Sequence, residues 1–461
     1  MTTVNTATMS ELEIFRPKGV VSADEMRAID KNADGFGSFA SDRMERAGKA
    51  LAEALNTEGD SHIIFLCGPG NNGGDGYVAA RYLKDKKVTV VSLGAKTPEA
   101  KAALSKLRDS GVEIETEIPR LNKDDVIVDC LLGTGAKPPL REPMKKLIDA
   151  VNASGARIIS CDLETPGIHA DRIIAFHLAK SERDEVYPIG IPEEADIFCG
   201  EGNLLIIPKK DANSHKGAGG TILVIGGGPY QGAPFLAGTA ALRGGADIVR
   251  VAAPVDGFMP DLILERLPGT KITKEHEVKL IALAKMADVV IAGPGLGTDE
   301  ESLAVARTVV AHAKRAVVDA DLLRKPLPKA QDATIYTPHK GEFSRLFGTL
   351  PETLKEQGLA VMAAAKETGA VILLKGKIDI ISDGTKVKFN SSGCAAMTVG
   401  GTGDVLAGIT GGLLARMSAF PAACAAAYAE GKIGEKAAET LGDGLMASDL
   451  LIKIAEILWK R

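Results

Sequence analysis

The chain of 461 residues has few aromatic side chains, no long hydrophobic run and no run of basic residues. Aromatic residues make up only 4%, too few for the stacking surface with which proteins bind single-stranded nucleic acid. A net charge of -5 attracts neither nucleic acid nor a membrane surface. No apolar run reaches the roughly 20 residues that span a bilayer, and the polar residues 1–10 do not resemble a signal peptide. We therefore expect a cytoplasmic protein without nucleic-acid or membrane partners.

Cysteine is also scarce, with six residues and no Cys-x-x-Cys pair. Cys67, Cys130 and Cys161 lie in apolar, strand-like runs, where a thiol behaves as a small hydrophobic group. This spacing argues against a disulfide framework and against a zinc site.

The length exceeds one ordinary hydrophobic core and favours two domains. In the first half, a helical pattern over 23–55 precedes short apolar runs that alternate with helices. Such runs predict a parallel sheet covered on both faces. The expected strands are 62–67, 88–93, 126–132, 157–163 and 173–176.

A polar segment at 209–217 predicts a linker, after which the alternation restarts. Further strands are expected at 221–225, 248–252, 289–292, 316–319 and 371–375, and a hairpin at 378–390. The fold class is therefore α/β, with two consecutive doubly wound three-layer αβα domains at 1–210 and 211–461.

The second domain carries Gly400-Gly-Thr-Gly-Asp404 at the start of a helix with apolar positions at helical spacing. Glycines before a helix let backbone N–H groups converge on an anion. Asp404 could simply cap this helix, or it could take a proton from a hydroxyl that attacks a phosphoryl group. Glycine, Asp, His or Lys residues also follow several other strands, where open α/β sheets bind ligands.

Six segments carry a resemblance to a known family: the linker segment His215–Gly217, the strand ends Gly293–Gly297, Asp319–Asp321, Thr337–Glu342 and Leu374–Gly376, and the helix start Gly400–Asp404. In this order they resemble the NAD(P)H-hydrate dehydratase family, whose fold is ribokinase-like. The family repairs reduced nicotinamide cofactors to whose ring water has added. It phosphorylates the ring hydroxyl with ADP or ATP, and elimination of phosphate then restores NAD(P)H.

The resemblance implies a role for each matching residue. Asp404 would be the catalytic base, and the nucleotide would bring magnesium. The hydrate would contact Ala233, Gly295, Gly297, His339 and Asp404, and the nucleotide would contact Lys375, Gly376, Lys377, Ile378, Asp379, Gly401, Thr402 and Gly403. Other interpretations of single residues are a loop hydrogen bond for His339, loop caps for Asp319 and Asp321, and a solvated strand end for Lys375.

The first domain has its own glycine-rich loop, Cys67-Gly-Pro-Gly-Asn-Asn-Gly-Gly-Asp-Gly76, between a strand and a helix. Such a loop should hold phosphate, and a bare glycine turn would not explain its two Asn and one Asp. Asp129 and Asp162 follow at later strand ends. Their oxygens could bind a hard cation or act as paired acid and base.

These segments, with Met44–Gly48, resemble the Rossmann-like NAD(P)H-hydrate epimerase family, which interconverts the two hydrate epimers. Asp162 would then be an acid/base group, and Asn72, Asp129 and Thr165 would hold a potassium ion. The hydrate would contact Asn71, Asn72, Gly73, Gly74, Asp75, Gly133, Thr134, Gly135, Ala136, Lys137, Pro138, Pro139 and Asp162. The family usually has Asp-x-Pro-Ser-Gly, whereas this chain has Asp162-Leu-Glu-Thr-Pro-Gly167, which puts the cation geometry in question.

We therefore expect a bifunctional repair enzyme for the hydrated forms of NADH and NADPH, which are written NADHX and NADPHX. We also expect a homo-oligomer, tetrameric or larger, as is common in the family. Two alternatives remain open. The second domain could be a small-molecule kinase related to hydroxyethylthiazole kinase, since Gly-Thr-Gly-Asp alone supports only that broader class. The first domain could be a non-catalytic nucleotide-binding module.

Overall fold

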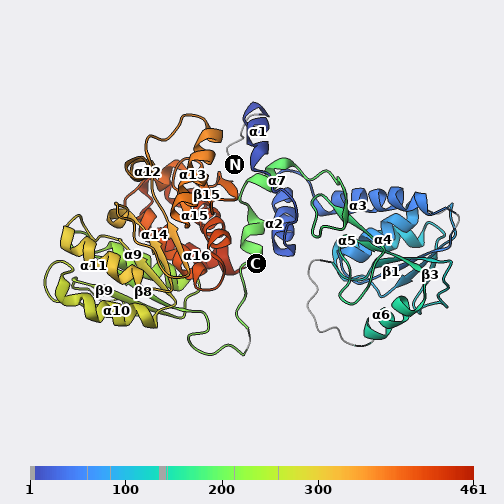
Figure 1. The fold of residues 1–461 in the computed structure, drawn as a ribbon, viewed down its shortest axis with the longest axis horizontal. Helices are drawn as coiled ribbons and strands as arrows, with labels where there is room; N and C mark the ends of the chain where they lie inside the picture. The colour runs from blue at the N-terminus through green and yellow to red at the C-terminus, as the bar shows by residue number, and fades with distance from the viewer. Residues whose placement is uncertain are drawn as a thin grey trace. The chain divides into compact units, whose positions relative to one another are not determined.

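A computed structural model describes residues 6–59, 61–83, 85–133, 142, 144–211, 213–257 and 259–460 (Figure 1). Its contacts divide the chain into two compact units. One, here the N-terminal unit, comprises residues 17–196, and the other, the C-terminal unit, comprises the residues up to Arg16 together with 197–461. Within the described residues, no helix is long and apolar enough to cross a membrane.

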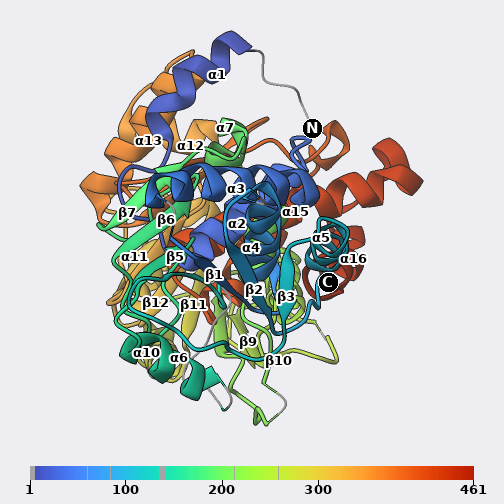
Figure 2. The same ribbon diagram turned by 90° about the vertical axis from the view of Figure 1, so that its right-hand side faces the viewer.

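The N-terminal unit is a parallel seven-stranded sheet with helices on both faces (Figure 2). Helices α3 and α4 pack on one face beside Phe65 and Cys67, whereas α6 packs on the other beside Ile64 and Leu66. The strand order is β3-β2-β1-β4-β5-β6-β7. Successive strands are added on one side of β1 as far as β3 and then on its other side from β4 onward. We call the position between β1 and β4, where the order of addition reverses, the reversal point of the sheet. The elements are α2 (Ala23–Asp34), α3 (Ala40–Leu55), β1 (Ile63–Cys67), α4 (Asn71–Tyr82), β2 (Val88–Ser92), α5 (Pro98–Arg108), β3 (Glu113–Glu115), β4 (Val126–Cys130), α6 (Met144–Ala153), β5 (Arg157–Cys161), β6 (Arg172–Phe176), β7 (Asp184–Tyr187) and α7 (Glu193–Ile197).

The C-terminal unit is a mixed nine-stranded sheet, β10-β9-β8-β11-β12-β13-β14-β15-β16, antiparallel only across β14, β15 and β16. Its reversal point lies between β8 and β11. The elements are α1 (Thr6–Leu12), α8 (Glu201–Leu205), β8 (Thr221–Ile225), α9 (Ala233–Arg243), β9 (Ile248–Ala253), β10 (Ile263–Arg266), α10 (Glu277–Met286), β11 (Val289–Ala292), α11 (Glu300–Ala311), β12 (Arg315–Val318), β13 (Ala333–Tyr336), α12 (Lys340–Phe347), α13 (Leu354–Thr368), β14 (Val371–Leu374), β15 (Asp379–Ser382), β16 (Val387–Asn390), α14 (Thr402–Leu414), α15 (Ala419–Leu441) and α16 (Ala447–Trp459).

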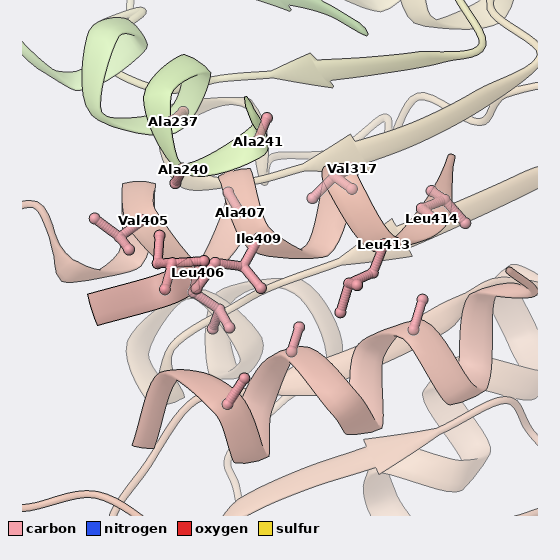
Figure 3. Packing of buried hydrophobic residues seen from close by; sticks show 14 of the residues in the cluster. Ala237, Ala240, Ala241, Val317, Val405, Leu406, Ala407, Ile409, Leu413 and Leu414 are labelled. Atoms are coloured by element: carbon pink, nitrogen blue, oxygen red, sulfur yellow. The ribbon is translucent and has the colours of Figure 1, made fainter. Parts of the chain in front are cut away.

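Helix α14, which begins in the Gly-Thr-Gly-Asp segment, is buried from Val405 to Leu414. Figure 3 shows Ala237, Ala240 and Ala241 of α9 packed against it. Glycine permits this close approach: a Cβ atom on Gly408 would lie 2.3 Å from the Ala237 carbonyl oxygen, and one on Gly412 would lie 2.7 Å from that of Ala241. The tight packing fixes the start of α14, and hence Asp404, relative to the sheet.

The two predicted α/β domains are confirmed, as are the hairpin and the buried, unpaired Cys67, Cys130 and Cys161. The single helix expected over 23–55 is wrong. The segment forms two helices, since α2 ends before Gly35 and Gly37 takes a positive φ of 82° that ends helical winding. The glycine loop is also shorter than expected, because Asn71 already begins α4.

Four strands, β3, β7, β10 and β13, have no counterpart among the expected strand ranges. Strand β13 is buried and directly precedes the strand-end segment Thr337–Glu342, whereas β3, β7 and β10 are partly exposed. Strands β3 and β10 end their sheets, as does β7. Edge strands lack the continuous apolar runs of buried strands, so their sequences do not stand out. The division at residue 196 also precedes the predicted boundary. Part of the predicted linker is held to the C-terminal unit, where the N–H groups of Gly217 and Gly219 donate to Asp247.

Candidate active sites

The glycine-rich segment of the N-terminal unit lies at the reversal point of its sheet, where β1 leads into α4. A Cβ atom on Gly68 would lie 1.8 Å from the Leu131 carbonyl oxygen, and one on Gly73 would lie 1.9 Å from the Gly68 carbonyl oxygen. Only glycine permits these approaches, which bring the start of α4 against the end of β4. The N–H groups at the helix start are thereby available to an anion.

Asp129, at the end of β4, is the centre of a buried hydrogen-bond network. Its carboxylate accepts from the Ser160 hydroxyl at 2.8 Å, and from the Thr165 hydroxyl and N–H at 2.7 and 2.9 Å. Burial raises the pKa of Asp129, and these hydrogen bonds oppose the rise. The altered segment 162–167 therefore still places the Thr165 oxygen beside Asp129.

Asn72 lies next to this network. Its Nδ2 donates to the Leu132 carbonyl at 3.0 Å, whereas its buried Oδ1 has no hydrogen-bond partner among the described residues. A Cβ atom on Gly133 would lie 3.4 Å from Asn72 Cβ, which places these two predicted substrate contacts side by side. The predicted contacts Thr134, Gly135, Ala136, Lys137, Pro138 and Pro139 lie outside the described residues.

Asp162 follows β5 in a left-handed backbone conformation, with a φ of 66°. Its Oδ1 accepts from the Lys180 ammonium at 2.6 Å and from the Phe176 N–H at 3.3 Å. Lys180 is almost completely buried and donates its other hydrogen bonds to the carbonyls of Phe176 and Leu178. A non-glycine residue at positive φ stores strain, which surrounding contacts must offset; here the buried lysine supplies them.

Asp75, in the first turns of α4, lies in an environment that disfavours its charged form. Burial raises its pKa well above the ordinary value, and the nearby carboxylates of Asp162 and Asp30 raise it further. The predicted contact Asn71 is exposed and accepts a hydrogen bond from Thr97, and Gly74 packs against Met44. Lys180 and Asp30 were not expected from the sequence, since each is an isolated charged residue outside any motif.

In the C-terminal unit, three strand-end loops converge at the reversal point between β8 and β11. A Cβ atom on Gly295 would lie 3.1 Å from the Ala233 Cβ. The Gly297 N–H donates to Asp321 at 2.9 Å, and Gly293 lies directly against the Asp319 carbonyl. The predicted hydrate contacts Ala233, Gly295 and Gly297 are thus brought together beside the Asp319–Asp321 segment.

Lys375 and Asp319 form an ion pair beside the Gly-Thr-Gly-Asp segment, with 2.8 Å between Nζ and Oδ1. A Cβ atom on Gly403 would lie 3.2 Å from this Nζ atom. Gly401 precedes α14 with a φ of 96°, a conformation that favours glycine. The cationic end of Lys375 therefore lies against the helix start that is expected to hold phosphate.

Asp404 is half-buried in the first turn of α14 and has no hydrogen-bond partner among the described residues. Burial raises its pKa to about 7, and Asp319 and Asp321 add to the rise while Lys375 opposes it. A base that accepts a proton near neutral pH functions best with such a value. The structure thus gives Asp404 a property that a simple helix cap does not need.

The remaining predicted nucleotide contacts surround Lys375. The Gly376 N–H donates to Asp379 at 2.9 Å, and burial raises the pKa of Asp379 to about 6. Lys377 is exposed, Ile378 is half-buried between it and Asp379, and Thr402 donates to the carbonyls of Met397 and Val399.

His339 is the N-cap of α12, and its backbone forms an isolated parallel β-bridge with that of Lys375. Its Nδ1 accepts from the Gly341 and Glu342 N–H groups. The loop-capping interpretation of His339 therefore describes a contact that it makes, alongside any contact with a ligand.

Glu430, in the middle of α15, was not expected from the sequence. It is buried near Lys375, Asp379 and Asp319, and its Oε1 has no partner among the described residues. Burial raises its pKa well above the ordinary value. It lies in an alanine-rich helix and belongs to no motif, so only the fold places it near the nucleotide segment.

No group of three or more His, Cys, Asp or Glu side chains is arranged to hold a metal ion in the described ranges. The N-terminal donor set is different in kind, because it combines amide, carboxylate and hydroxyl oxygens. Asn72 is linked to Thr165 and Asp129 through Leu132, and its unpartnered Oδ1 is an oxygen ligand that suits a hard cation such as potassium.

Comparison with known proteins gives matches for both units. A sequence model of the NAD(P)H-hydrate dehydratase family matches residues 222–456, and one for the YjeF-related protein N-terminus matches residues 40–179. The bifunctional NAD(P)H-hydrate repair enzyme Nnr of Methanospirillum hungatei is 46% identical, and the alignment covers 97% of this chain and 95% of that protein. The corresponding enzyme of Archaeoglobus fulgidus is 38% identical, with coverage of 95% and 98%.

Two solved structures support the fold of the C-terminal unit. A ribokinase-like superfamily protein from Enterococcus faecalis aligns with a TM-score of 0.50 and 25% identity, covering 57% of this chain and 95% of that one. A protein from Streptococcus mutans aligns with a TM-score of 0.51 and 25% identity, covering 57% and 99%.

Proposed function

The chain belongs to the family of bifunctional NAD(P)H-hydrate repair enzymes, with a dehydratase and an epimerase activity, and from this membership we propose which residues perform each reaction. The dehydratase site is the cluster around Asp404 in the C-terminal unit. The epimerase site is the cluster around Asp162 in the N-terminal unit.

In the dehydratase reaction, Asp404 takes the proton of the ring hydroxyl, and the hydroxyl oxygen attacks the β-phosphorus of ADP. AMP leaves. The ring then loses the phosphate together with a proton from the neighbouring ring carbon, which the departing phosphate accepts, and the ring double bond is restored. The N–H groups of Gly401, Thr402 and Gly403 and the ammonium of Lys375 bind the transferring phosphoryl group. The observation that carries this assignment is the pKa of about 7 for Asp404 at the N-terminus of α14.

Magnesium would enter with the phosphates of the nucleotide, whose charge it partly neutralises. The carboxylates of Asp319 and Asp321 lie close enough to Asp404 to raise its pKa. Since Asp319 already pairs with Lys375, Asp321 is the side chain that would face the ion, which leaves Asp404 free to accept the proton.

In the epimerase reaction, the carbon that changes configuration bears both the ring nitrogen and the hydroxyl group. Loss of this hydroxyl as water and return of water to the opposite face inverts the centre, which needs one proton donor and one acceptor. Asp75, with its raised pKa, is suited to donate, and Asp162, ion-paired with Lys180, is suited to accept. The hydrate would lie over Asn71, Asn72, Gly73 and Gly74, with its phosphates at the start of α4.

Potassium would be held by Asn72 Oδ1, Asp129 and Thr165. It would fix the Asn72 side chain and the end of β4 beneath the substrate. The unpartnered Oδ1 of Asn72 supports this assignment, and so does the Thr165 hydroxyl, which reaches Asp129 despite the unusual segment 162–167.

The hydrate assay tests both proposals. Purified protein is mixed with each epimer of NADHX or NADPHX, with ADP, with ATP or with no nucleotide, and the absorbance of the reduced nicotinamide ring is followed. We expect recovery with ADP from both epimers. No recovery with either nucleotide would refute the dehydratase assignment, whereas a stable phosphorylated alcohol as product would favour the small-molecule kinase.

Interconversion of the epimers at no more than the spontaneous rate would leave the N-terminal unit as a non-catalytic binding module. We also expect a homo-oligomer, tetrameric or larger. Light scattering measures its mass directly, and a monomeric mass would contradict that expectation.

A further inference from the structure

A cavity of about 600 Å³ lies at the carboxyl ends of β2 and β3 in the N-terminal unit, outside the site described above. Its wall is mainly apolar, with Leu104, Ile114 and Met144, and the polar side chains on it are Ser92, Thr116 and Arg108. Mostly apolar cavities with a few polar groups are typical of sites for small organic ligands. None of the residues assigned to potassium or to the hydrate lines it.

Two hydrogen bonds join residues 93–97, the loop after β2 that lines part of this cavity, to the glycine-rich segment. The Thr97 hydroxyl donates to Asn71 Oδ1 at 2.5 Å, and the Lys96 N–H donates to the Pro69 carbonyl at 2.8 Å. Strands β1, β2 and β3 are consecutive in the sheet and parallel (Figure 2). A ligand whose phosphates lie at the start of α4 therefore reaches the cavity by continuing along the same edge of the sheet.

The distance also suits a dinucleotide. Asp162 follows β5, and four strand spacings separate β5 from β3. At about 4.8 Å per spacing this is roughly 19 Å, comparable to the span of an extended dinucleotide. The buried Tyr77 hydroxyl hydrogen-bonds Ser92 Oγ at 2.7 Å and the Gly94 carbonyl at 2.9 Å, and so fixes two residues that line the cavity.

Arg108 is the cationic side chain of the cavity. It ends α5, is exposed, and makes no hydrogen bond or ion pair within the described part of the chain. A guanidinium group matches the oxygens of a phosphate in a bidentate manner. In dinucleotide-binding sheets, an arginine close to the adenosine ribose accommodates the additional 2′-phosphate of the NADP form. Here Arg108 reaches the cavity from the last turn of α5, the helix that follows β2.

We propose that this cavity binds the adenosine end of the hydrated dinucleotide, and that Arg108 binds the 2′-phosphate that distinguishes NADPHX from NADHX. The proposal rests on the proposed epimerase function, because it takes the hydrate as the ligand of the N-terminal unit. It assigns the cavity to substrate affinity and the arginine to discrimination between the two cofactor forms.

Photolabelling tests the site without requiring turnover. The full-length protein is irradiated with 8-azido-NADP⁺, with and without excess NADP⁺, and the labelled peptides are mapped. We expect label within residues 92–116 that NADP⁺ suppresses and that Arg108→Ala reduces at least fivefold. Lys101→Ala, an exposed residue of the same helix that does not line the cavity, is the matched control.

Epimerase kinetics give the second measurement. Arg108→Ala is expected to raise KM for NADPHX about tenfold and KM for NADHX less than twofold, with kcat and dehydratase activity unchanged. Label confined to other segments would overturn the adenosine site, and an equal rise of both KM values would overturn the 2′-phosphate contact. Specific labelling of 92–116 by a protein that does not epimerise would instead refute the proposed epimerase while supporting the binding site.

Discussion

The two units share a close backbone approach at the start of a helix, but the aspartates that we propose as catalytic, Asp404 and Asp162, lie in different electrostatic surroundings. Asp404 is half-buried without a hydrogen-bond partner among the described residues, and its pKa rises to about 7. Asp162 is held in a left-handed conformation by a buried lysine 2.6 Å away. The comparison teaches that the same glycine-rich helix start can accompany carboxylates of different character, because neighbouring charges and burial set the properties of each carboxylate.

The shared device is a close backbone approach at each reversal point. A Cβ atom on Gly68 would lie 1.8 Å from the Leu131 carbonyl oxygen, and one on Gly226 would lie 2.0 Å from the Pro294 carbonyl oxygen. Each glycine directly follows a central strand and contacts the loop after the neighbouring strand. The same chemistry of glycine thus builds both crevices, in sheets with different numbers of strands.

The largest expected effect separates the two acids directly. Asp404→Asn is expected to lower dehydratase kcat about 1000-fold, because a positioned general base contributes roughly 100- to 10,000-fold. Epimerase activity of the same preparation should remain within twofold of wild type. Asp162→Asn should give the reverse pattern, and a variant of either residue that impaired both activities would argue against two independent sites.

Replacing Lys180, whose ammonium group pairs with Asp162, is the next test. Lys180→Met is expected to lower epimerase kcat about 100-fold, because Asp162 loses its ion pair and its orientation. Lys180→Arg should restore part of the rate, since it keeps the charge but not the fit of the three hydrogen bonds. Circular dichroism and dehydratase activity serve as controls for folding, and a Lys180→Met enzyme with normal epimerase kcat would remove Lys180 from the site.

Potassium should affect one unit only. Replacing potassium by sodium is expected to slow epimerisation about tenfold and to leave dehydration unchanged, because the unpartnered Asn72 oxygen belongs to the N-terminal unit. Thr165→Val should be slow in both salts. Equal rates in potassium and sodium for the wild type would exclude a specific potassium site.

The smallest expected effect is on the pH profile. Asp404 must be ionised to accept a proton, so dehydratase kcat should rise with pH through about 7 and then level off. Between pH 7 and pH 6 the ionised fraction of such a group falls about fivefold, and kcat should fall with it. A dehydratase rate that stays constant down to pH 5 would show that the proton acceptor is not a carboxyl group with this pKa.

Much of each site could be predicted from its motifs, because local sequence carries the reason. The segments Gly400–Asp404 and Cys67–Gly76 contain the glycines that allow close approach to a backbone or a phosphate. The alternation of apolar runs and helical patterns predicted two doubly wound sheets. Periodicity does not reveal helix capping or a positive φ. It therefore did not predict that α4 begins at Asn71, or that Gly35 and Gly37 divide the first helical segment.

The partners of these motifs could not be predicted, because they come from elements remote in the chain. Lys180 reaches Asp162 from beyond β6, and Glu430 reaches the Lys375 region from the middle of a helix. Similarly, the residues up to Arg16 belong to the C-terminal unit, where Phe15 packs on Phe389 at 5.4 Å between ring centroids.

For this protein, the sequence by itself determined the two α/β domains, the positions of the two glycine-rich helix starts and the choice of Asp404 and Asp162 as the proposed catalytic residues. These follow from local rules, since strand periodicity and glycine conformation act within a few residues. Only the tertiary structure decided the electrostatic state of the two acids and the cavity beside Arg108. Burial, charge pairing and cavity shape depend on which side chains the folded sheet brings together.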